Sequence, residues 1–122
     1  MRIDAVFIGL GVAILILGMA FGMWIGANGA FQYADAHAHL NLLGFVVSTL
    51  YGLLYRAYPD LERSRLAWPQ CITHFVGVLI FVPGILIVTL MGNETPVIAG
   101  GILVMLAALT FGFVFFTARK SN

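Results

Sequence analysis

The stretch AVFIGLGVAILILGMAFGMWIGA, residues 5–27, contains no charged side chain and decides the fold class of this chain. A helix of about 20 apolar residues crosses the hydrocarbon layer of a membrane. The run is longer than the roughly 7–15 apolar residues of a secretory signal peptide, although Ala27-Asn28-Gly29 offers small residues for cleavage. The stretch therefore predicts a retained transmembrane helix.

Three further apolar runs follow, and each is also long enough to span a bilayer. Of the 122 residues, 61% are hydrophobic and only 9% are charged, whereas a soluble domain carries about 25% charged residues. Because lipid offers no hydrogen bonds to an unpaired backbone, these runs must be helices. The sequence predicts a single domain, residues 1–122, built as an all-α bundle of four transmembrane helices in a lipid bilayer. The expected helices cover about residues 5–27, 37–58, 68–91 and 96–118.

Lysine and arginine are distributed unevenly over the ends of these runs. All 6 of them lie near the N-terminus, near the C-terminus, or at the connection between the second and third runs. The other two connections carry only the acids Asp35 and Glu94. Because basic residues stay on the cytoplasmic side, we expect cytoplasmic termini in a multi-pass protein of the cell inner membrane. The basic residues are Arg2, Arg56, Arg63, Arg65, Arg119 and Lys120.

Glycines follow one face of the first run. Gly11, Gly18, Gly22 and Gly26 lie along one line of a helix, and the last three repeat at intervals of four residues. This spacing of small residues lets two helix backbones approach closely in a membrane. We interpret these glycines as packing positions, and they predict a tight contact between the first helix and a neighbour.

The second run begins with the pair His37-Ala-His39, at the outer end of its helix in this orientation. Residues two apart on a helix differ by about 200° in direction and by about 3 Å in height. Within one chain the two imidazoles therefore cannot bind one ion, but they can serve two sites that flank the helix. An ionisable residue inside a membrane segment indicates a functional site. The alternative is that both rings hydrogen-bond water at the membrane boundary.

Haem suits this pair better than a bare metal ion. Neutral imidazole is a common axial ligand of haem iron, and beneath His39 the residues Leu43, Val46 and Leu50 offer the dry face that a porphyrin needs. Copper or zinc alone would need more ligands that converge on one point. The opposite face of the helix carries polar or small residues, namely His37, Asn41, Gly44, Ser48, Tyr51 and Tyr55.

The segment His37-Ala-His39-Leu-Asn41-Leu-Leu-Gly44-Phe45 resembles the haem-bearing helices of subunit I of the haem-copper oxidases. The His39-x-Asn41 part is similar to the second helix of the C-family oxidases, in which this histidine ligates the low-spin haem b. The His-x-His spacing is similar to the tenth helix of the same subunit, in which two histidines serve two different haems. The resemblance implies haem b (heme b), with His37 and His39 as iron ligands and Asn41 beside them.

The chain also differs from those oxidases. Their copper requires three more histidines on other helices, and their active site contains a His-Pro-x-x-Tyr motif; this chain has only His74 besides the pair, and no such motif. We therefore expect electron transfer without a copper centre and without catalytic residues, with a quinone or a cytochrome as redox partner. Two alternatives stay open: a cofactor-free accessory or assembly subunit of a respiratory complex, and a haem carrier or nitric-oxide-responsive haem protein. The net charge of +1 points to no nucleic-acid partner.

Two further residues bear on the site. His74, in the third run, is expected to hydrogen-bond Thr73, a tyrosine of the second helix or a buried water; an inner-side haem, proton or quinone site is the alternative. Asp35, just before the second helix, is expected to cap that helix or to lie in its first turn. Its carboxylate could also orient the ring of His37 or His39, as acids beside metal ligands do.

The opposite directions of His37 and His39 predict how several chains assemble. A haem between two neighbouring chains would take His37 from one chain and His39 from the next, and a closed ring uses every histidine once. Subunit I of the oxidases consists of three arcs of four helices, and this chain resembles one arc. The resemblance implies a homotrimer with one bis-histidine haem per chain; a dimer is the alternative.

Overall fold

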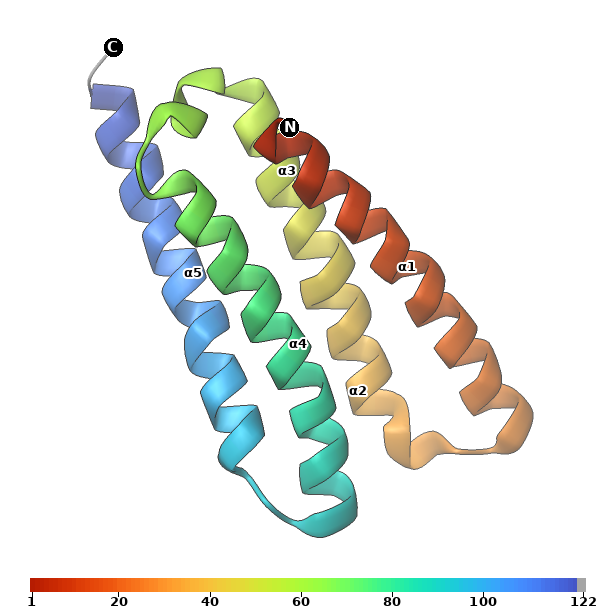
Figure 1. Cartoon of the computed structure of the whole chain (residues 1–122). Helices are drawn as coiled ribbons and strands as arrows, with labels where there is room; N and C mark the ends of the chain where they lie inside the picture. The colour runs from red at the N-terminus through yellow and green to blue at the C-terminus, as the bar shows by residue number, and fades with distance from the viewer. Residues whose placement is uncertain (121–122) are drawn as a thin grey trace.

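The computed structural model describes residues 1–120 of the chain, with side chains through Ala118. In that part the chain is all-helical, and short connections join four long apolar spans (Figure 1). Three of the spans are single α-helices: α1 (Ile3–Asn28), α4 (Ala67–Met91) and α5 (Thr95–Lys120). The predicted all-helical, four-helix architecture is confirmed.

The second span changes its helical geometry along its length. A 3₁₀ turn, η1 (Phe31–Tyr33), leads into α2 (Ala34–His39), and a π-helix, η2 (Leu40–Val47), then continues into α3 (Ser48–Ala57). The α-helical part of the span begins at Ala34 rather than at His37, where the sequence predicted the start of the helix. The histidine pair consequently lies inside a formed helix and next to the π-helix.

Glycines of α1 bring this helix against the second span. A Cβ atom added to Gly22 would lie 2.6 Å from the Cε1 atom of His37, and one added to Gly18 would overlap the amide group of Asn41. The predicted packing role of these two glycines is therefore confirmed. Gly26 takes no part in the contact, because no atom lies within 4 Å of an added Cβ.

α4 packs along α5, again through glycines. A Cβ atom added to Gly84 would lie 2.6 Å from the backbone nitrogen of Val97, and one added to Gly100 would overlap the backbone of Phe81. A helix backbone cannot move aside as the tip of a side chain can. Only glycine therefore allows the two helices to approach this closely at both positions.

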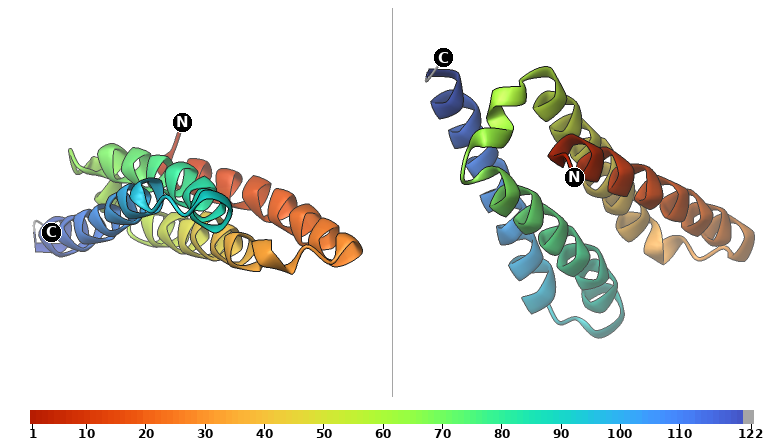
Figure 2. Two further views of the ribbon diagram at one scale, coloured as in Figure 1. Left: turned by 90° about the horizontal axis from the view of Figure 1, so that it is seen from below. Right: turned by 45° about the horizontal axis from the view of Figure 1, so that its top comes forward.

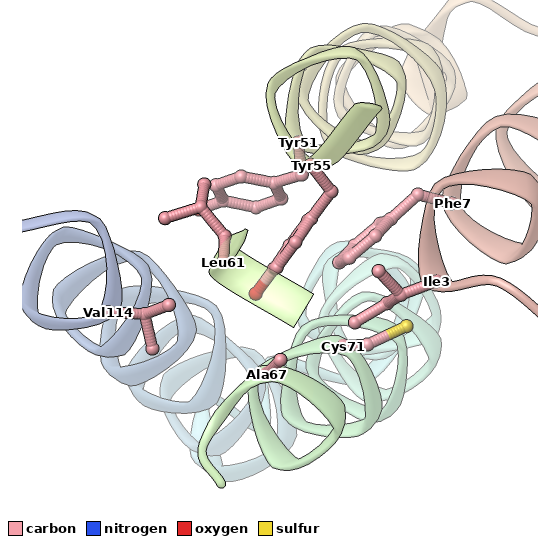
Figure 3. Close-up of a cluster of buried hydrophobic side chains, with 8 residues drawn as sticks. All are labelled: Ile3, Phe7, Tyr51, Tyr55, Leu61, Ala67, Cys71 and Val114. Atoms are coloured by element: carbon pink, nitrogen blue, oxygen red, sulfur yellow. The ribbon is translucent and has the colours of Figure 1, made fainter. Parts of the chain in front are cut away.

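The helices converge at one end of the molecule, and the two helix pairs diverge toward the other end (Figure 1, Figure 2). A buried cluster lies at the converging end, with side chains from α1, α3, α4, α5 and the short helix η3 (Pro59–Arg63) (Figure 3). Nearer the middle, an apolar crevice of about 390 Å³ separates α1 from α4. The buried cluster comprises Ile3, Phe7, Tyr51, Tyr55, Leu61, Ala67, Cys71 and Val114.

Most of the apolar surface lies on the outside of the four spans. Each span is long and apolar enough to cross a membrane, yet only 17% to 33% of its most apolar stretch is buried inside the molecule. Helices that are apolar on their outer faces are stable in lipid rather than in water. The N-terminal end of α1 and the C-terminal end of α5 also lie at the same end of the molecule (Figure 1). These findings indicate a multi-pass membrane protein.

Candidate functional site

His37 points from α2 toward α1, where Gly22 makes room for its ring. The ring lies edge-on to that of Phe21, with the ring centroids 6.1 Å apart. The Nδ1 atom of His37 is buried and has no hydrogen-bond partner among the described residues. The same side chain lines an open groove of about 540 Å³ between α1 and the start of the second span. His37 thus lies at the edge of the groove, with the side of its ring that carries both nitrogens against Gly22 of α1.

His39 points the other way, toward α4. Its ring lies edge-on to that of Phe81, with the ring centroids 5.4 Å apart. Its Nδ1 atom lies 2.9 Å from the backbone oxygen of Asp35, one turn earlier in α2. Because a carbonyl oxygen only accepts hydrogen bonds, Nδ1 carries the hydrogen, and in the neutral ring Nε2 then keeps its lone pair. This hydrogen bond orients the ring and leaves Nε2 available for a metal, as in most metal-binding histidines.

The two rings therefore contact different helices on opposite sides of α2, as the sequence predicted. Asp35 lies in the first turn of α2, which is one of the two positions predicted for it. However, the backbone carbonyl of Asp35 orients His39, not its carboxylate. The prediction of a carboxylate partner is wrong at this point, because a carbonyl one helical turn back already lies within reach of Nδ1.

Asn41 lies on the same side of the second span as His37. It packs against Gly18, and its Oδ1 atom is buried without a hydrogen-bond partner in the described part of the chain. Asn41 and His37 both line the groove, together with the thioether side chains of Met19 and Met23. The groove therefore combines two polar side chains with an otherwise apolar wall.

The three aliphatic residues predicted beneath His39 do not form one face. Leu43 turns inward and packs against a buried cluster of α2 and α4 residues. Val46 and Leu50 lie on the outside, where they are 41% and 53% exposed. The π-helix separates the direction of Leu43 from that of Val46 and Leu50, because each of its backbone hydrogen bonds joins residues five apart, whereas those of an α-helix join residues four apart. Positions that follow His39 are consequently shifted around the helix axis.

His74 lies in α4 and is fully buried. Its Nε2 atom lies 2.9 Å from the hydroxyl oxygen of Ser48 and 3.1 Å from the backbone oxygen of Leu43. The predicted hydrogen bond to the second span thus exists, but its partners differ from those that the sequence suggested. The Nδ1 atom of His74 is buried without a hydrogen-bond partner among the described residues, and aromatic rings pack around the imidazole. The surrounding rings belong to Phe7, Tyr51 and Phe75.

Sequence reasoning did not single out a second buried polar pair, Tyr55 and Gln70. The hydroxyl group of Tyr55 donates a hydrogen bond of 3.1 Å to Oε1 of Gln70, and Gln70 is fully buried. The sequence does indicate such a buried polar group, since Gln70 and His74 lie four residues apart in an apolar run and so share one helix face. Both residues point from α4 toward α3.

Between residues 1 and 120 no three side chains of His, Cys, Asp or Glu converge on one point. His37 and His39 present their imidazoles separately, one toward α1 and one toward α4.

Comparisons of the chain with protein-family models, with curated protein sequences and with solved structures found no match. The hydrogen bond of His39 defines which of its two ring nitrogens is available to a ligand.

Proposed function

We propose that this protein is a membrane-bound b-type cytochrome that binds haem b through His37 and His39 and transfers electrons without a copper centre. The geometry of His39 is the observation that carries the proposal. Its Nδ1 atom donates to the carbonyl group of Asp35 at 2.9 Å, so its Nε2 atom is preoriented as a ligand. A ring that is already fixed loses little conformational freedom when it binds iron, which favours ligation.

His37 supplies the second imidazole of the proposed site. It faces the groove of about 540 Å³, and its buried Nδ1 atom has no partner in the described structure. Haem b would supply a one-electron couple, and ligation by two imidazoles leaves no open position for oxygen. The groove walls other than His37 and Asn41 are apolar, which suits the apolar face of a porphyrin.

The proposal includes an orientation in the membrane. All the basic residues lie near one end of the molecule, at the chain ends and around η3, so we assign this end to the cytoplasm. The histidine pair lies near the start of the second span, and this orientation therefore places it toward the periplasmic side of the inner membrane. A redox partner would reach it there, either as a quinone within the membrane or as a cytochrome at its surface.

The proposal also includes a homotrimer. The rings of His37 and His39 contact different helices, so one chain cannot place both on one iron. In a closed ring of chains, His37 of each chain and His39 of its neighbour share a haem. Three chains reproduce the twelve helices of the oxidase subunit that this chain resembles, and a dimer is the competing assembly. The large exposed apolar surface of the spans supports burial against neighbours as well as lipid.

The experiment for this proposal is a reduced-minus-oxidised absorption spectrum of the protein purified from membranes. A sharp α band typical of low-spin haem b is the expected result. A preparation without Soret absorption would contradict the proposal and favour the cofactor-free accessory subunit. A high-spin spectrum would contradict bis-histidine ligation and favour the haem carrier.

A further inference from the structure

The π-helix η2 is the irregular part of the second span. Its eight residues follow His39 directly. Extended π-helices are rare, and the shorter π-bulges found in α-helices occur frequently at functional sites. Because a π-helix is poorly stable on its own, something outside the segment must favour it over the α-helix.

His74 of α4 contacts the π-helix at its widened backbone. Its Nε2 atom lies 3.1 Å from the backbone oxygen of Leu43, and the Ser48 hydroxyl group donates to the same oxygen at 3.1 Å. Since this oxygen can only accept, the Nε2 atom of His74 carries the hydrogen and donates it. A side chain that inserts into the hydrogen-bond ladder in this way is a known cause of local helix distortion. The fully buried His74 is therefore bound to the backbone of η2 and to the Ser48 side chain of α3.

This contact affects the direction in which the histidine pair points. A shift of one residue along an α-helix corresponds to a rotation of about 100°. If η2 became α-helical, the part of the span before it, with His37, would rotate about the helix axis relative to α3, and Asn41 at the start of η2 would turn with it. The contacts of these two residues with Gly22 and Gly18 would then be lost.

We propose that His74 is a positioning residue that maintains the π-helix and thereby sets the directions of His37 and His39. The consequence for haem rests on the proposed function, whereas the consequence for helix geometry does not. His74 acts through the backbone of Leu43 and does not itself touch the groove.

A cysteine pair measures the helix rotation without haem. A Cβ atom at position 18 would lie 2.9 Å from the Cγ atom of Asn41, so cysteines at both positions come within reach of a disulfide, whose Cβ atoms lie about 3.5–4.5 Å apart. The parent for the test is Gly18→Cys with Asn41→Cys and Cys71→Ala in the full chain. Replacing Asn41 removes the amide that occupies this space, and its Oδ1 atom makes no hydrogen bond in the described structure.

The test compares three substitutions in this parent, with disulfide formation followed by intact mass after mild oxidation. His74→Phe keeps an aromatic ring but removes the donor, and we expect it to abolish the cross-link. His74→Gln restores a donor near the same position and should recover the cross-link. Gln70→Ala removes an equally buried polar side chain one turn away, whose hydrogen bond comes from Tyr55 of α3, and should leave the cross-link unchanged. A full cross-link in His74→Phe, or its loss in Gln70→Ala, would overturn the proposal.

The haem spectrum supplies the second measurement, on the wild-type sequence with the same three substitutions. His74→Phe should shift the reduced spectrum or remove haem, while Gln70→Ala should not. An unchanged spectrum and an unchanged midpoint potential in His74→Phe would contradict the positioning role. If wild-type protein lacks haem altogether, the proposed function fails, but the cross-link result still decides whether His74 maintains the π-helix.

Discussion

Two imidazoles separated by one alanine have different surroundings in this structure. His39 is oriented by a hydrogen bond to the backbone of Asp35, whereas the Nδ1 atom of His37 is buried without a partner among residues 1–120. The first ring is already in the tautomer that binds metal through Nε2. The two histidines should therefore contribute unequally to haem binding, with His39 as the stronger ligand.

The substitution His39→Ala tests this assignment. We expect most of the haem to be lost, or the spectrum to change from low-spin to high-spin, because the oriented axial ligand is absent. Haem per chain in the purified variant is the measurement. The control is Gln32→Ala, an exposed position before the same helix, which should keep full haem. A His39→Ala protein made in normal amount, with full haem and an unchanged spectrum, would show that the assignment is wrong.

The space around His37 gives a second prediction for a single residue. Gly22→Ala places a Cβ atom 2.6 Å from the ring of His37, so the ring must leave its position in the contact with α1. Overpacking of this kind costs about 1–3 kcal/mol, and thermal unfolding in detergent should show a lower midpoint. Gly26→Ala is the matched control, because open space surrounds Gly26. Equal midpoints for both variants would be evidence against the close contact.

At the scale of whole helices, the pair α4 and α5 depends on backbone contact rather than on side-chain interlocking. Gly100→Ala would bring a Cβ atom into the backbone of Phe81. The helices must then separate, and we expect a loss of about 1–3 kcal/mol in the free energy of unfolding. Gly112→Ala has open space around its Cβ and should be neutral or slightly stabilising, because alanine favours a helix over glycine. If chemical denaturation gives both variants the same stability, the helix pair is not held as described.

The sequence predicts the four spans well because hydropathy alone decides where a chain can cross lipid. Their ends agree with the structure within a few residues, apart from the α-helical part of the second span, which begins earlier, at Ala34. The π-helix could not be predicted, since it depends on the contact between His74 and the backbone of Leu43, which are 31 residues apart. For the same reason the aliphatic face expected beneath His39 is divided. A period of 3.6 residues describes a regular α-helix. It no longer predicts which residues share a face where a distant side chain alters the backbone hydrogen bonds of the helix.

At the scale of the whole molecule, the proposed electron transfer without a copper centre predicts what the purified protein contains and does. If the proposal holds, elemental analysis finds no stoichiometric copper, and the purified protein does not reduce oxygen at rates typical of an oxidase. Oxygen consumption with a reduced electron donor measures this directly. Stoichiometric copper together with turnover would contradict the assignment to electron transfer.

We propose that His37 of one chain and His39 of the next chain share each haem, so the directions of the two histidines determine how the chains assemble. Native mass spectrometry of the protein, released gently from detergent, tests both parts at once. The predicted result is a trimer that carries three haem b groups, and loss of haem and of trimer together in either His37→Ala or His39→Ala. A haem-loaded monomer, or a stable trimer without haem, would contradict the claim.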